Sequence, residues 1–313
     1  MTTNIKTTPD FTSRLVNGIL SIQPLFNLAK HRARQMMIKR AAKIGVNWYA
    51  EVEKLQARNW EDDLSQIQNP QITYPEYYTT SFHAYESGNL SWQAAFEVEP
   101  AAYAVHAKIW QDFQADGDAK LRESYHNILK NYLSQSPQNI LDLGCSVGMS
   151  TFALQEIYPQ AKITGLDLSP YFLAVANYRS QQRQNHKSNI NCNINWVHAQ
   201  AESTGLADNS FDLVSIFLMC HELPQSATKN IFTEAKRVLR PGGHLAIMDM
   251  NPQSEIYKKM PTYVFTLLKS TEPYLDEYFT LDIEQVLIEC GFKKPNITVN
   301  SPRHRTVIAQ VSK

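Results

Sequence analysis

The chain has 313 residues, of which 30 are basic and 30 acidic, so its formal net charge is zero and its pI is about 7.1. This length predicts about two domains, or one domain with a sizeable appendage, and the balanced charge excludes a uniformly basic nucleic-acid-binding protein. No apolar run approaches the roughly 18 residues that a membrane span needs. The four cysteines (Cys145, Cys192, Cys220 and Cys290) lie far apart without a CxxC pair, which excludes a zinc ribbon and indicates a reducing, cytoplasmic compartment.

The zero net charge is the sum of two unlike parts. Residues 1–50 hold eight Lys or Arg and one carboxylate, Asp10, whereas the remaining residues hold 22 basic and 29 acidic side chains. Helical patterning over 14–49, divided at Pro24, predicts a basic helical arm within residues 1–65. The arm is interpreted as a solvated extension, as an organelle-targeting presequence, or as a segment that rests on an anionic membrane surface through residues 14–49.

Residues 66–135 are rich in aromatic and histidine side chains, and the pattern after Pro100 is helical. We predict a helical cap here, with residues 77–93 as a lid over a pocket. The aromatic rings would then wall an apolar ligand. The alternative is ordinary packing of a helical subdomain against the rest of the protein.

From residue 136 onwards, short apolar strands alternate with helices, which is typical of a parallel α/β sheet. Strands are predicted at 139–143, 162–166, 194–198, 213–217 and 244–248, and helices at 149–158, 170–183 and 225–239. The residues that follow predict a helical insertion near 253–280, a further helix and two closing strands.

A glycine-rich turn follows the first predicted strand, in NILDLGCSVGMST at residues 139–151. Gly144 and Gly148 allow the backbone to approach a ligand closely, and the next helix offers free N–H groups. The G-x-G-x-x-G of dinucleotide-binding folds is absent, and Asp142 precedes the first glycine. The second strand ends at Asp167, 19 residues after Gly148, where a carboxylate can accept from both ribose hydroxyls or cap the next helix.

Four segments follow one another in a fixed order: LDLGCSVG (141–148), GLDLSPYFLAVA (165–176), AQAESTGLADNSFDLV (199–214) and EAKRVLRPGGHLAIMD (234–249). In order and spacing they resemble the class I S-adenosylmethionine-dependent methyltransferases, and within these the small-molecule branch of quinone and sterol methyltransferases. The resemblance implies a Rossmann-like, seven-stranded α/β sheet with helices on both faces. It also implies a methyltransferase domain over 136–313 that uses S-adenosylmethionine and requires no metal.

The resemblance places the methionine part of the cofactor in the first loop, where Asp142 would balance its ammonium group. The surrounding residues would be Asp142, Gly144, Cys145, Ser146 and Gly148. Ser146 replaces the middle glycine that is frequent in the family, a change that a small side chain allows.

The other cofactor contacts would follow the next three strands. Asp167 would hold the ribose hydroxyls, and Leu168 would lie against the adenine. Gln200 stands where the family commonly has Asp, so its amide oxygen would accept from the adenine amino group without charge assistance. The adenine edge is expected on Gln200, Ala201 and Glu202, and the methyl-donor site on Phe217 and Leu218.

The segment CHELP, residues 220–224, directly follows the fourth predicted strand. Ligands of open α/β sheets sit beyond the carboxyl ends of the strands, so His221 and Glu222 are candidate catalytic residues. His221 titrates near neutral pH and is a candidate base, which Glu222 would orient. The alternative is that His221 packs under the lid and Glu222 caps the following helix.

The acceptor pocket is predicted from aromatic residues on both sides of this segment. Tyr85 is the preferred contact, with His83 and Trp92 behind it, and Tyr263 of the insertion on the other wall. The sequence Arg303-His304-Arg305 is interpreted either as an anion site or as an exposed strand end.

We therefore predict transfer of a methyl group to a small, apolar or aromatic acceptor by in-line displacement. Alignment of the reacting atoms can contribute about 7–11 kcal/mol to such a reaction. The alternatives are methylation of a protein or nucleic acid, or a non-catalytic assembly factor that binds S-adenosylmethionine. The expected partner is a small molecule and not a nucleic acid.

Overall fold

The computed structural model describes residues 23–80, 85, 87–186 and 194–312. One seven-stranded sheet has the order β3-β2-β1-β4-β5-β7-β6, and β7 runs antiparallel to both of its neighbours. The strands are β1 (Asn139–Leu143), β2 (Lys162–Asp167), β3 (Ile194–His198), β4 (Phe211–Phe217), β5 (Leu239–Met250), β6 (Asn296–Val299) and β7 (His304–Gln310). The predicted seven-stranded α/β sheet is confirmed.

The central strands are apolar on both faces because helices cover both faces. Ile140 and Leu213 pack with α7 (Gly117–Tyr132) and α8 (Met149–Ile157) on one side. Leu141 and Val214 pack with α10 (Gln225–Val238) and α14 (Ile283–Glu289) on the other side. This double covering fixes the register of β1 between β2 and β4 and brings the carboxyl ends of all three strands to one edge.

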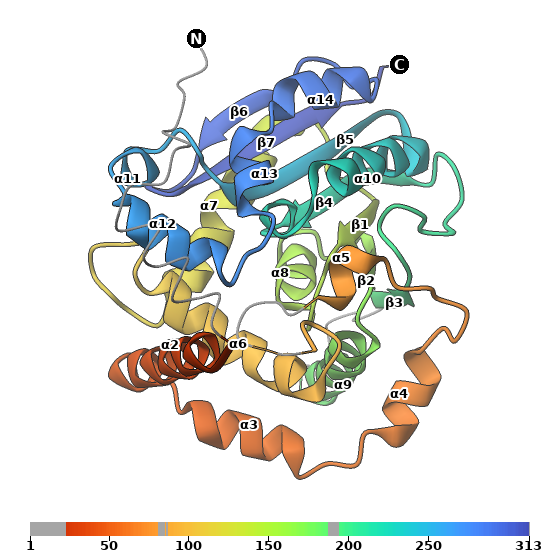
Figure 1. The fold of residues 1–313 in the computed structure, drawn as a ribbon. Coiled ribbons are helices and arrows are strands. Elements are labelled where there is room, and N and C mark those ends of the chain that lie inside the picture. The colour runs from red at the N-terminus through yellow and green to blue at the C-terminus, as the bar shows by residue number, and fades with distance from the viewer. Residues whose placement is uncertain (1–22, 81–84, 86, 187–193, 313) are drawn as a thin grey trace.

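The N-terminal helices form a separate layer next to α9 (Pro170–His186). Figure 1 shows α2 (Gln23–Lys43), α3 (Trp48–Gln56), α4 (Glu61–Ile67) and α6 (Trp92–His106) together on the side of the molecule away from β6 and β7. The short helix α5 (Glu76–Thr79) lies apart from them, near the ends of the central strands.

The described part of the basic arm is docked on this layer rather than extended into solvent. Ile38 and Ala41 of α2 are buried in the same apolar cluster as Ala104 of α6. The Arg34 guanidinium donates to the carboxylate of Glu97, which is only 1% exposed. Because a buried carboxylate needs a partner, this ion pair fixes α2 against α6. Residues 14–22 of the arm lie outside the described residues.

The helical insertion after β5 contains three short helices instead of the single one predicted. They are α11 (Glu255–Lys258), α12 (Thr262–Lys269) and α13 (Leu275–Thr280). Pro261 directly precedes α12 and Pro273 precedes α13, and proline cannot donate the hydrogen bonds of a continuous helix. Among the described helices, none is both long and apolar enough to cross a membrane.

Candidate active site

The glycine-rich turn after β1 lies at the carboxyl edge of the sheet, where it is held by β2. The N–H groups of Gly144 and Cys145 both donate to the carbonyl oxygen of Leu166. Gly144 has a φ of 67°, and a Cβ at this position would overlap the sulfur of Met219. Ser146 also has a positive φ, of 51°, and its Oγ is buried without a hydrogen-bond partner. The turn is therefore a close-fitting loop that only small residues can form.

Asp142 is fully buried at the end of β1. Its Oδ2 accepts hydrogen bonds from the hydroxyls of Ser150 and Thr151, each at 2.7 Å. Its Oδ1 is buried and has no hydrogen-bond partner. Burial raises the pKa of Asp142 to about 6, although both hydroxyls oppose this shift. An unpartnered buried carboxylate oxygen fits a cationic donor such as the ammonium of a methionine moiety.

Asp167 lies at the end of β2 and faces the same turn. Its two carboxylate oxygens accept from the backbone N–H groups of Ser146 at 2.7 Å and Ser169 at 2.8 Å. Burial raises the pKa of Asp167 to about 6, despite these hydrogen bonds. The carboxylate thus ties the turn to the start of α9, as a cap would. Each of its oxygens keeps a second lone pair that can accept from a hydroxyl.

The segment before α6 covers the β2–β3 side of this edge, where Figure 1 shows α5 near the ends of the strands. Gln200 donates to the carbonyl of Thr73, and the Tyr77 hydroxyl donates to Glu202. Burial, and then the negative charges of Asp167 and Glu222, raise the pKa of Tyr78 well above its usual value. Predicted adenine-edge residues therefore contact the cap.

His198 fastens this covering segment to the sheet. Its Nε2 lies 3.0 Å from the carbonyl oxygen of Leu168, and its Nδ1 accepts from the N–H of Asn69 at 2.9 Å. This pattern requires the Nε2–H tautomer, which is neutral, and burial lowers the pKa of His198. The histidine thus links the loop that carries Leu168 to the cap.

His221 lies beyond β4 and pairs with a carboxylate at the end of β5. Its Nδ1 is 2.7 Å from Oδ1 of Asp249, and its backbone N–H donates to Oδ2 at 3.3 Å. Burial alone would lower the pKa of His221, but Asp249, with smaller contributions from Glu272 and Glu222, raises it to about 10. The side chain is therefore an imidazolium at neutral pH, which donates hydrogen bonds and does not accept a proton.

The predicted methyl-donor residues, Phe217 and Leu218, both pack with the apolar cluster on the α7–α8 side of the sheet. Phe217 packs against Tyr125 of α7, with the guanidinium of Arg122 over its ring at 4.4 Å. Leu218 has a φ of 55°, and its N–H donates to the carbonyl of Met248. This left-handed residue turns the chain at the end of β4 and brings Met219 over Gly144.

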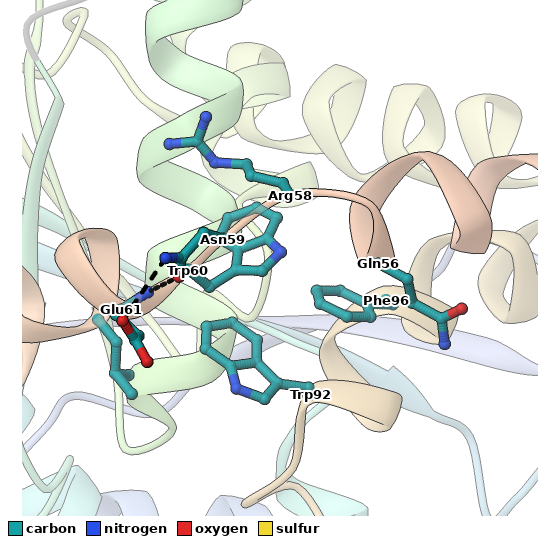
Figure 2. Close-up of a pocket in the computed structure, with 8 residues that line it drawn as sticks. Gln56, Arg58, Asn59, Trp60, Glu61, Trp92 and Phe96 are labelled. Carbon is teal, nitrogen blue, oxygen red and sulfur yellow. Dashed lines mark hydrogen bonds between the residues drawn. The ribbon is translucent and has the colours of Figure 1, made fainter.

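The aromatic residues predicted for the acceptor pocket do not gather at one place. The Tyr85 hydroxyl donates to the buried Glu97 at 3.1 Å, and Tyr263 is 44% exposed on α12. Trp92 packs against Trp60, Phe96 and Tyr171. Trp92, Trp60 and Phe96 line an open hollow of about 320 Å³. Figure 2 shows their side chains. His83 lies outside the described residues.

Three residues at this edge were given no role from the sequence, namely Tyr78, Met219 and Asp249. Met219 directly follows the predicted Leu218, and Asp249 ends the fourth family segment, so both had a positional signal. Tyr78 lies within the predicted lid, residues 77–93, but was given no role of its own.

Known protein families and structures match the part of the chain that forms this site. Residues 141–247 match the methyltransferase domain family, and they run from β1 through most of β5. The chain carries a methyltransferase domain. An uncharacterised methyltransferase of Synechocystis is 29% identical over 171 residues, which is 54% of this chain and 74% of that protein.

A demethylmenaquinone methyltransferase of Listeria welshimeri is 33% identical over 116 residues. The match covers 37% of this chain and spans about half, 46%, of the relative. Among solved structures, phosphoethanolamine N-methyltransferase 2 of Haemonchus contortus aligns with a TM-score of 0.54 at 14% identity. That alignment covers 78% of this chain and 62% of the other and supports the fold alone. The turn at Gly144 and the unpartnered oxygen of Asp142 fit the cofactor of S-adenosylmethionine-dependent methyltransferases.

Proposed function

We propose that the protein transfers the methyl group of S-adenosylmethionine to a small acceptor with an apolar or aromatic body. The bound cofactor supplies an electrophilic methyl sulfonium. The acceptor's nucleophilic atom forms a bond to the methyl carbon while the carbon–sulfur bond breaks. A proton leaves the acceptor if its nucleophilic atom carried one. The protein's task is to align the reactants and exclude water.

The observation that carries this proposal is the unpartnered, fully buried Oδ1 of Asp142 beside the close-fitting turn at Gly144. Leaving such an oxygen unsatisfied costs the folded protein about 1–3 kcal/mol, unless a ligand supplies the donor. In our proposal the methionine ammonium supplies it, and Asp167 accepts from the ribose hydroxyls. Similarity to a demethylmenaquinone methyltransferase supports a small, quinone-like acceptor.

We assign His221 and Glu222 to the acceptor side of the site, beyond β4. The imidazolium of His221 is a hydrogen-bond donor to an oxygen of the acceptor, and Asp249 fixes its ring orientation. The negative charge of Glu222 contributes to the raised pKa of both His221 and Tyr78. Glu222 is therefore better suited than His221 to receive a proton from an acceptor hydroxyl.

A cytoplasmic location and peripheral membrane contact through residues 14–49 are part of the same proposal. The three cysteines that the structure describes are free and buried, which is consistent with a reducing compartment. Arg32, Lys39 and Lys43 of α2 are exposed and supply the positive charge that an anionic membrane surface attracts.

The proposal is tested by calorimetric titration with S-adenosylmethionine. Wild-type protein should bind one equivalent, and Asp142→Asn should weaken binding by about 10- to 100-fold because a charge-assisted hydrogen bond is worth about 1.5–3 kcal/mol. Asp212→Asn is a matched control, since Asp212 lies at the opposite end of the sheet beside Asn139. Absence of binding by wild-type protein, or equal affinity of Asp142→Asn and wild type, would contradict the proposal.

A further inference from the structure

One segment of the cap crosses the cofactor edge of the sheet without a buried core of its own. It comprises residues 68–80, which follow α4 and include the short helix α5 (Figure 1). We call these residues the strap. All of them are exposed or half-buried, whereas Trp60 before the strap and Phe96 after it are buried. Because few buried contacts hold the strap, it is expected to open at a low free-energy cost.

The strap covers the loops that carry the predicted ribose and adenine contacts. Beyond β3, the side chain of Gln200 donates to the carbonyl oxygen of Thr73. The carboxylate of Glu202 accepts from the hydroxyl of Tyr77. Asp167, at the end of β2, is only 6% exposed. A cofactor therefore reaches this carboxylate only when part of the covering structure moves.

His198, the last residue of β3, bonds to the strap and to a cofactor loop with the same ring. Its Nδ1 accepts from the backbone N–H of Asn69 in the strap at 2.9 Å, and its Nε2–H donates to the carbonyl oxygen of Leu168 at 3.0 Å. The hydroxyl of Tyr74, also in the strap, lies 3.5 Å from Nε2. The neutral ring thus joins the strap to the loop that precedes α9.

Protonation of His198 breaks one of these contacts and keeps the other. An imidazolium carries an N–H group on each ring nitrogen. The Nε2–H group still donates to Leu168, but the new Nδ1–H group points at the N–H of Asn69, and two donors repel each other. The contact to the strap is therefore specific to the neutral ring.

The surroundings of His198 favour the neutral ring while the strap is in place. Burial lowers the pKa of His198, and its hydrogen bond to Leu168 opposes this shift. The closed strap is therefore favoured above the ordinary histidine pKa of 6.5, and it loses the Asn69 contact as the pH falls below that value.

The titratable groups of the elements packed on β3 have other partners or are exposed. These elements are β2, α4, α9 and the strap itself. In the strap, Tyr78 stacks on Tyr74, Tyr77 bonds to Glu202, and Glu76 is exposed. On the other elements, Asp167 accepts from Ser146 and Ser169, Asp63 pairs with Arg58, Arg179 with Glu99 and Arg183 with Glu156, Tyr171 packs on Trp92 and Tyr178 on Trp60, and Glu61, Asp62 and Lys162 are exposed.

We propose that the strap is a lid over the cofactor and that His198, in its neutral form, is the positioning residue that holds this lid closed. The inference rests on the proposed function, because S-adenosylmethionine is the ligand that the lid retains. His198 acts through Asn69 and Leu168 and not on the reacting atoms. Its protonation releases the strap and speeds the exchange of the cofactor.

The test measures the dissociation rate of radiolabelled S-adenosylmethionine from the full-length protein, chased with unlabelled cofactor near pH 7.5 and near pH 5.5. Two substitutions separate the two ring nitrogens. His198→Asn can place an amide oxygen where Nδ1 lies, so it accepts from Asn69 at both pH values. His198→Gln can place an amide nitrogen where Nε2 lies, so it keeps only the contact to Leu168.

Wild-type protein should release the cofactor about 3- to 10-fold faster near pH 5.5 than near pH 7.5, beyond any change in His198→Asn, because one hydrogen bond is lost. Asp142 and Asp167 titrate in both proteins, so this comparison cancels their effect. His198→Gln should already release the cofactor about 3- to 10-fold faster than wild type near pH 7.5. His244→Asn, which removes a half-buried histidine of β5 beside Tyr132, is the control and should match wild type.

The outcomes separate the lid from the proposed function. Cofactor binding with the same pH profile in wild type and His198→Asn, or a wild-type rate for His198→Gln near pH 7.5, overturns the lid alone. A wild-type protein that binds no S-adenosylmethionine contradicts the proposed function, and the lid with it.

Hydrogen exchange of the Asn69 amide tests the latch in the absence of cofactor. Relative to its intrinsic exchange rate, this amide should be protected in wild type near pH 7.5 and about 3- to 10-fold less protected near pH 5.5. Protection should be independent of pH in His198→Asn and low throughout in His198→Gln. Equal protection of the wild-type amide at both pH values overturns the role of His198.

Discussion

Replacing Asp249 by Asn breaks the buried pair with His221 while it preserves the shape of the side chain. The His221 and Asp249 side chains are 13% and 1% exposed, so an unpaired imidazolium would remain in a poorly hydrated site. Breaking a buried ion pair costs about 3–5 kcal/mol. A pKa raised from 6.5 to about 10 corresponds to about 5 kcal/mol, which is the same magnitude. We expect Asp249→Asn to lower the free energy of unfolding by about 3–5 kcal/mol at pH 7.

The contribution of the His221–Asp249 pair to the free energy of unfolding should depend on pH. The folded-state pKa of His221 lies above its unfolded value, so the pair's contribution is fully present below pH 6.5 and is lost as the pH rises through about 10. Urea unfolding at several pH values should therefore show the largest difference between wild type and Asp249→Asn near pH 6. Glu289→Gln, which removes an exposed partner of Lys229, is the control and should leave stability unchanged. Equal stability of Asp249→Asn and wild type, or an NMR titration of wild-type His221 near pH 6.5, would refute the reasoning.

Two other substitutions test the turn and the docked arm. Gly144→Ala places a Cβ against the Met219 sulfur at a φ of 67°, so we expect weaker binding of S-adenosylmethionine and a loss of about 1–3 kcal/mol in stability. Met219→Ala in the same chain should restore part of the calorimetric affinity, and no rescue would point to backbone strain alone. Glu97→Gln removes the buried charge and leaves the partly exposed Arg34 without its charged partner, so it should cost about 1.5–3 kcal/mol in urea unfolding. Faster proteolysis within α2 should accompany this loss, and an unchanged cleavage rate would contradict the docking of the arm.

Much of the sheet and its cofactor edge follows from local sequence signals. β1 and β3 begin and end at the predicted residues, 139–143 and 194–198. Residues 140–143 of β1 are buried because helices cover both faces of this central strand, whereas β3 at the edge of the sheet is mostly half-buried. Asp142 and Asp167 lie at one edge because parallel strands end together. These features depend on the periodicity of apolar residues and on the residue types in the turns, and both can be read from a short segment of the sequence.

The charge state of His221 could not be predicted from local sequence signals. The segment CHELP correctly places the side chain beyond β4, but whether it is a base or an imidazolium depends on Asp249, 28 residues later on the neighbouring strand. The charge state is set by distance and burial, and neither is encoded locally. In the same way, the arm's positive charge did not reveal that Arg34 pairs with a buried carboxylate of α6.

The zero net charge and the basic arm illustrate which properties the sequence determines and which the tertiary structure determines. The sequence by itself determined the asymmetry of charge, the α/β sheet and the residues of the methyltransferase segments, because composition, periodicity and motif spacing are properties of the chain. Only the tertiary structure decided which cations of the arm are neutralised, such as Arg34 by Glu97, because ion pairing requires contact between residues far apart in the sequence.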